Sequence, residues 1–166
     1  MISVEEALEK ILSYVSILET EEKPVLESLG QVLDEDIHSS IQVPPLDNSA
    51  MDGYAVQWAS IRQASEATPQ VLKVIGEVAA GNLPDKMIES GTAIRIMTGA
   101  PIPPGADTVV PFEDTDEIAR KEKNITPGNS WEVGILKPVA EGANIRLAGE
   151  DIAQGALVLQ RGTELR

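Results

Sequence analysis

Apolar side chains recur at helical spacing near the start of the chain. Ser3, followed three residues later by Glu6, forms the capping box that often opens a helix. The apolar positions that then fall on one helical face are Val4, Ala7, Leu8, Ile11, Leu12 and Val15. The pattern therefore predicts an amphipathic helix starting at residue 4, whose apolar face has to pack against the chain's own core or a partner subunit.

Further along, the apolar pattern changes to short runs typical of strands. The runs richest in strand-forming residues lie at 54–56, 71–78, 91–97, 108–112, 131–136 and 156–159. A helical turn is expected at 24–29, ended by Gly30, and a less regular strand at 31–37. The highly charged segment 114–123 is expected to be a solvated turn or hairpin tip. Short strands joined by glycine and proline turns predict a mainly β fold, a barrel or a sandwich.

Charge and composition narrow the classes of partner. The 166 residues include 27 acidic and 13 basic side chains, which give a formal net charge of −14. The resulting negative electrostatic field disfavours binding of nucleic acid. An anionic substrate would need a cation or a local arginine. The absence of cysteine excludes disulfides and a thiol nucleophile and fits a reducing cytoplasm. No apolar run is long enough to span a membrane, so we expect a cytoplasmic protein without a membrane partner.

The single histidine limits the chemistry further. His38 cannot form a histidine metal cluster, and no serine, histidine and acid triad can be assembled convincingly around it. It is expected to be a solvent-facing strand residue.

One polar loop follows the consecutive prolines Pro44 and Pro45. Its sequence is Asp47-Asn48-Ser49-Ala50-Met51-Asp52-Gly53-Tyr54-Ala55, and this mixture of residues is typical of a backbone held in turns. Asn48 or Ser49 can cap a single helical turn, while Asp52 and Gly53 can form the bend that leads into a strand. Asp52 at that corner can bind a metal, accept a proton or serve only the N–H groups of its own loop.

Two more loops carry candidate chemistry. Thr98 follows the strand at 91–97 and precedes a loop containing three prolines, so it can be a binding group or the cap of an ordinary turn. In the third loop Arg146 precedes Glu150 and Asp151 across a glycine bend. Arg146 can bind a phosphate or another oxyanion and Asp151 can bind Mg²⁺, but the same residues can also form an internal ion pair.

Together, three motifs resemble the MoeA/gephyrin family. They are Pro-Pro-Leu-Asp-Asn-Ser-Ala-Met-Asp-Gly-Tyr-Ala at 44–55, Arg-Ile-Met-Thr-Gly-Ala-Pro-Ile-Pro at 95–103 and Asn-Ile-Arg-Leu-Ala-Gly-Glu-Asp-Ile at 144–152. The resemblance spans essentially all 166 residues. It implies a molybdopterin molybdenumtransferase, which inserts molybdate into adenylylated molybdopterin and releases AMP in molybdenum cofactor biosynthesis.

The resemblance also implies a fold. It is a β-rich α+β fold with bifurcated and coiled sheets, an N-terminal helix and an inserted β domain. Residues 1–44 with 143–166 would form a dimerisation domain, and residues 45–142 would form the inserted domain that contributes to the active-site cleft. The expected assembly is a homodimer.

The residue roles implied by the resemblance follow from the matching motifs. Asp52, Thr98 and Asp151 would be catalytic, with Asp52 and Asp151 holding Mg²⁺, and Arg146 and Ser49 would contact substrate. Leu147 and Ala148 replace more basic residues of some relatives, which weakens the role of Arg146. Family members continue into domains that bind the molybdopterin, so we expect these 166 residues to be inactive alone. The alternative is a non-catalytic dimerisation or scaffold module.

Overall fold

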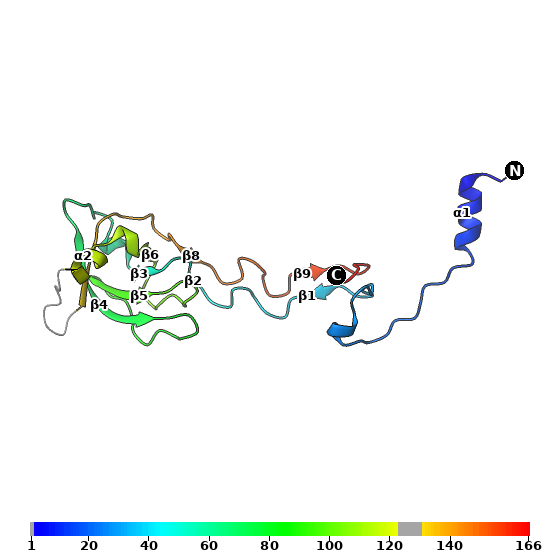
Figure 1. The fold of residues 1–166 in the computed structure, drawn as a ribbon, viewed down its shortest axis with the longest axis horizontal. Helices are drawn as coiled ribbons and strands as arrows, with labels where there is room; N and C mark the ends of the chain where they lie inside the picture. The colour runs from blue at the N-terminus through cyan, green and yellow to red at the C-terminus, as the bar shows by residue number, and fades with distance from the viewer. Residues whose placement is uncertain (1, 123–130) are drawn as a thin grey trace. The chain divides into compact units, whose positions relative to one another are not determined.

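The computed structural model of the chain describes residues 2–122 and 131–166. Contacts divide it into two units, one of residues up to His38 with Leu157–Arg166, and one of Ser39–Ala156. Over the described residues strands outnumber helices, which confirms the predicted β-rich fold (Figure 1). The predicted domain division, 1–44 with 143–166 against 45–142, remains a prediction. None of the helices within the described residues is long and apolar enough to cross a membrane.

The first unit begins with the predicted helix, α1 (Val4–Leu12). Its capping box is present, because the Glu6 N–H donates to Ser3 Oγ (3.1 Å) and the Ser3 N–H donates to Glu6 Oε2 (3.0 Å). No residue of α1 is buried. The helix is followed by the predicted helical turn, observed as the 3-10 helix η1 (Val25–Glu27).

The two strands of this unit are short. β1 (Ile37–His38) pairs antiparallel with β9 (Leu157–Leu159), and His38 is exposed there as expected. The strand predicted over 31–37 is wrong, because only an isolated bridge at Val32 precedes β1. The chain bends between them, where Asp34 forms an ion pair with Arg161 (2.6 Å) and Asp36 accepts a hydrogen bond from the Arg161 N–H (2.8 Å).

The second unit is built on a five-stranded sheet with the order β6-β3-β5-β4-β7. The strands are β3 (Gly53–Val56), β4 (Gln70–Val78), β5 (Thr92–Ile96), β6 (Thr108–Pro111) and β7 (Trp131–Ile135). All neighbours are antiparallel except β4 and β5, which are parallel. Each strand overlaps a run predicted from the sequence, although β3 and β4 begin one residue earlier than predicted.

Both faces of this sheet are covered by apolar residues. Tyr54 and Val56 of β3 pack into one core cluster, while Ala55 between them packs into the other. Because successive strand residues point to opposite faces, a strand covered on both sides is apolar at consecutive positions. The 3-10 helix η2 (Trp58–Ser60) follows β3, and Trp58 packs against the first cluster.

Neither edge of the sheet is bare. The β6 edge is covered by residues 142–144, where the Val109 N–H donates to Ala143 O (3.0 Å). Residues 114–116 cover the β7 edge, where the Asp116 N–H donates to Gly134 O (2.9 Å). Covered edges leave fewer backbone groups open to unwanted strand pairing.

The segment after β6 corrects a prediction. Instead of a solvated turn or hairpin tip, it contains η3 (Phe112–Asp114) and α2 (Glu117–Glu122). The Glu117 N–H donates to Thr115 Oγ1 (3.3 Å) just before α2, and the Glu117 side chain is buried against the sheet rather than solvated. The predicted segment extended to residue 123, which lies outside the described residues.

Candidate functional site

All three polar loops predicted from the sequence meet around Ser49. β2 (Asn48–Ser49) pairs antiparallel with β8 (Ile145–Arg146), which joins the first loop to the third. The Gly99 N–H donates to Ser49 O (2.8 Å), and the Ser49 N–H donates to Ala100 O (3.0 Å), which joins the second loop. Segments far apart in the sequence thus form one candidate site within the second unit.

Ser49 lies at the centre of this junction and is buried. Its Oγ donates to Met51 O (2.6 Å), so its hydroxyl proton stabilises the loop. Asn48 and Ser49 form a strand, and the predicted helical cap at these residues is wrong. Contact between Ser49 and a substrate remains a prediction.

Asp52 and Thr98 are brought together at the ends of β3 and β5. Asp52 Oδ1 accepts hydrogen bonds from both the Thr98 N–H and Thr98 Oγ1, each 2.7 Å long. The Phe112 N–H donates to Asp52 O (3.1 Å) and fixes the backbone at the same place. Gly53, the next residue, is required because a Cβ there would lie 2.0 Å from Val110 O.

These contacts determine the ionisation of Asp52. The Thr98 N–H, then the Thr98 hydroxyl and, more weakly, the Arg95 charge hold the pKa of Asp52 below its usual value. Asp52 is therefore a carboxylate at neutral pH, with Oδ2 outside the hydrogen bonds to Thr98. Since Thr98 gives its hydroxyl proton to Asp52, its oxygen can still accept a hydrogen bond from a ligand.

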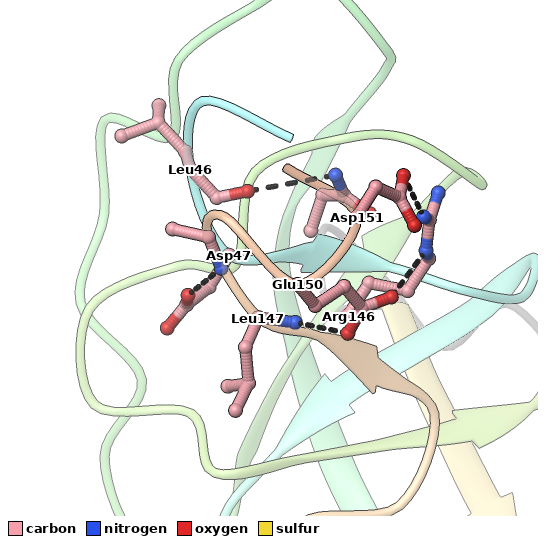
Figure 2. A network of polar contacts seen from close by, with 8 residues as sticks. Leu46, Asp47, Arg146, Leu147, Glu150 and Asp151 are labelled. Atoms are coloured by element: carbon pink, nitrogen blue, oxygen red, sulfur yellow. Dashed lines mark hydrogen bonds and ion pairs between the residues drawn. The ribbon is translucent and has the colours of Figure 1, made fainter. Parts of the chain in front are cut away.

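The third loop forms the internal ion pair that was one of its two predicted states. Figure 2 shows Arg146 between two carboxylates, with Nε donating to Glu150 Oε1 (2.7 Å) and Nη2 donating to Asp151 Oδ2 (2.6 Å). Hydrogen bonds to Asp151 and Glu150 raise the pKa of Arg146. The Arg146 side chain remains 40% exposed, so the pair lies at the surface.

Asp47 holds the first and third loops together, although it was not among the predicted site residues. Its Oδ1 accepts the Ala148 N–H (2.7 Å). The Asp151 N–H donates to Val43 O (3.0 Å) and adds a second tie. The only sequence signal is general, because an aspartate in a turn often binds backbone N–H groups.

The site can supply only part of a metal coordination shell. No cluster of three or more histidine, cysteine, aspartate or glutamate side chains that could hold a metal occurs among residues 2–122 and 131–166. Asp52 and Asp151 each have one oxygen outside the hydrogen bonds described above. Either carboxylate fits Mg²⁺, which proteins commonly bind through one or two carboxylates, with water and substrate phosphates completing the shell.

The chain matches a known protein family over almost its whole length. Residues 2–166 match the sequence model of a family described as the MoeA N-terminal region, domains I and II. The chain belongs to this family. The family resemblance seen in the sequence is therefore confirmed, and the three loops that converge on Ser49 lie within the matched residues.

Curated proteins with similar sequences support the assignment to this family. The molybdopterin molybdenumtransferase of Staphylococcus aureus (strain MRSA252) is 37% identical over 161 residues, which cover 97% of the chain and 36% of that protein. Molybdopterin molybdenumtransferase 2 of Mycobacterium tuberculosis (strain CDC 1551 / Oshkosh) is 38% identical over 139 residues, covering 84% of the chain and 32% of that protein. The chain thus spans about a third of the length of these curated relatives.

A solved structure shows the same fold. The molybdopterin biosynthesis moeA protein from Pyrococcus horikoshii OT3 matches with a TM-score of 0.83 and 39% sequence identity. The match covers 98% of the chain and 40% of that protein chain. The fold of this MoeA region and its sequence motifs therefore agree.

Proposed function

We propose that these residues act as the N-terminal part of a molybdopterin molybdenumtransferase in molybdenum cofactor biosynthesis. The reaction would insert molybdate into adenylylated molybdopterin with release of AMP. The observation that carries the proposal is the Asp52–Thr98 pair at the junction of three MoeA motifs. Because the chain spans 36% of the Staphylococcus aureus relative, it would supply part of the active site and be inactive alone.

The proposed roles follow from charge. Molybdate, the adenylate and the pterin phosphate are anions, so Asp52 and Asp151 would repel them without a cation. The free oxygen of each carboxylate would be a ligand for Mg²⁺, which neutralises and orients substrate oxygens when bound. Thr98 fixes the orientation of Asp52 and offers its oxygen to a substrate donor.

Arg146 and Ser49 would have more conditional roles. Arg146 would bind a phosphate or oxyanion of the substrate through the N–H groups that do not bond Glu150 or Asp151. Ser49 primarily supports the loop, and because its side chain is buried, a substrate contact requires the loop to open.

The test is a chimera in which residues 1–166 replace the matching part of the Staphylococcus aureus relative. Molybdate-dependent AMP release from adenylylated molybdopterin is measured for the chimera, its Asp52→Asn variant and an Asp85→Asn control at an exposed acid outside the three loops. We expect Asp52→Asn to lower kcat by about 10- to 100-fold, as loss of a metal-supporting group commonly does. Normal specific activity in folded Asp52→Asn would refute the role of Asp52. AMP release by the isolated chain would refute the proposal that it is inactive alone.

We also propose a homodimer, in a cytoplasmic protein. In α1, Val4, Leu8 and Ile11 are 80%, 55% and 63% exposed, so the apolar face of the helix is uncovered. A second copy can cover this face. Sedimentation equilibrium of the chain and of Leu8→Glu tests this, because a charge on the face should shift the equilibrium toward monomer. A dimer that makes no contribution to catalysis in the chimera would favour the alternative of a dimerisation or scaffold module.

A further inference from the structure

A nearly buried arginine lies behind the Asp52–Thr98 pair. Arg95, in β5, is directly opposite Tyr54 of β3, and its side chain is only 12% exposed. Such a buried charge needs a partner. Its Nε lies 3.4 Å from Oε2 of Glu117, whose side chain is 4% exposed. The two charges can therefore neutralise each other inside the unit.

Arg95 also contacts each backbone segment that surrounds Asp52. Its Nη1 donates to Gly53 O (3.2 Å), immediately after Asp52, and more weakly to Ile96 O (3.5 Å), two residues before Thr98. The guanidinium lies 5.4 Å from the ring centroid of Tyr54 and 5.8 Å from that of Phe112, distances typical of cation–π contacts.

The contact with Phe112 links Arg95 to the backbone of Asp52. The Phe112 N–H is the group that donates to Asp52 O. Arg95 therefore touches the start of β3, the end of β5 and the start of η3, the three segments whose relative positions set the geometry of the Asp52–Thr98 pair.

We propose that Arg95 is a positioning residue for the Asp52–Thr98 pair, anchored by Glu117 and holding these three segments so that Asp52 accepts both hydrogen bonds from Thr98. This inference rests on the proposed function for its catalytic meaning, but its structural content concerns the chain alone. Arg95 does not need to touch substrate in this role.

Lysine cannot replace arginine in this role. The planar guanidinium can pair with a carboxylate, donate to carbonyl oxygens and stack on rings at the same time, whereas an ammonium is a compact point charge. Arg95→Lys keeps the positive charge but loses the planar arrangement of several N–H donors. The effect of charge can therefore be separated from the effect of geometry.

The test uses the 166-residue chain and two NMR measurements that do not depend on catalysis. They are the pKa of the Asp52 carboxyl, from a ¹³C titration, and the hydrogen-exchange rate of the Thr98 amide. The principal variant is Arg95→Met with Glu117→Gln, which removes both buried charges and leaves neither unpaired. The matched control is Arg120→Met, which breaks the α2 pair between Arg120 Nε and Asp116 Oδ2 (2.7 Å).

In the double variant we expect the pKa of Asp52 to rise and the Thr98 amide to exchange about 3- to 10-fold faster, as loss of one hydrogen bond would cause. The control should leave both values unchanged. Unchanged values in a folded double variant, or equal changes in the control, would overturn the inference. If the double variant does not fold, Arg95→Lys decides, because it should speed Thr98 exchange, and wild-type exchange would overturn the inference.

The chimera separates this inference from the proposed function. There Arg95→Lys should lower kcat with little change in KM, because Asp52 is misplaced while substrate groups remain. An active Asp52→Asn chimera would refute the proposed function, whereas the NMR measurements on the chain would still decide the role of Arg95.

Discussion

Replacing Gly53 by alanine tests how closely the chain is packed beside Asp52. A Cβ at this position would lie 2.0 Å from Val110 O, 2.8 Å from Val110 C and 3.0 Å from Pro111 Cα. All three are backbone atoms of β6, which is hydrogen-bonded to β3 on one side and to Ala143 on the other. β6 therefore cannot move away without losing other bonds.

The expected cost follows from this contact. Overpacking a well-packed region costs about 1–3 kcal/mol, and a clash with backbone belongs at the upper end. A loss of about 3 kcal/mol should lower the melting temperature of a unit of this size by about 10 °C. Because the movement is beside Asp52, the pKa of Asp52 should rise as its bonds to Thr98 weaken.

Tryptophan fluorescence during urea unfolding measures the effect in the correct unit. The chain has two tryptophans, and both Trp58 and Trp131 belong to the unit of Ser39–Ala156. The matched control is Gly76→Ala in β4, where the new Cβ would meet only the end of the Lys86 side chain, at 3.6 Å or more. A Gly53→Ala unfolding free energy within about 0.5 kcal/mol of the control would refute the argument from packing.

Three further predictions use other contacts. Ser3→Ala should destabilise α1 by about 0.5–2 kcal/mol through loss of its cap, seen as reduced helical circular dichroism and faster exchange of the Glu6 amide. Thr98→Val should raise the pKa of Asp52 in an NMR titration while the backbone N–H bond remains. Because the folded pKa of Asp52 lies below the reference value of 3.8, its stabilising contribution is present above that pH and is lost as the pH falls through the folded pKa, so Thr98→Val should shift this loss to higher pH. Arg146→Met should change the unfolding free energy by less than about 1 kcal/mol, measured by tryptophan fluorescence, because its ion pairs are partly exposed.

Local patterns were sufficient where an element depends mainly on its own residues. The Ser3–Glu6 capping box predicted the start of α1, and consecutive apolar residues such as Val109 and Val110 predicted a strand. The strand expected at 31–37 failed, because Asp34 and Asp36 engage Arg161 from the far end of the sequence. The pattern of residues within 31–37 contains no information about Arg161.

The arrangement of the candidate site depends on pairings that periodicity does not encode. The loops containing Asp52 and Thr98 meet because β3 pairs with β5, and Asp52 and Thr98 are 46 positions apart. The motif resemblance singled out the residues, while the structure supplied their geometry. Arg95 had one sequence signal, since it interrupts an apolar run from Ala93 to Ile96, but its partner Glu117 lies in a segment expected to be solvated.

The charges around the candidate site indicate that an anionic substrate needs a bound cation. Arg146 is engaged by Glu150 and Asp151, and Arg95 is engaged by Glu117, so neither arginine offers an uncompensated positive charge. The chain as a whole carries a formal charge of −14. The Asp52 carboxylate therefore repels an approaching anion unless a cation binds between the carboxylate and the anion. In the proposed reaction, Mg²⁺ held by the free carboxylate oxygens would supply that charge, and the fixed orientation of Asp52 by Thr98 would determine where it lies.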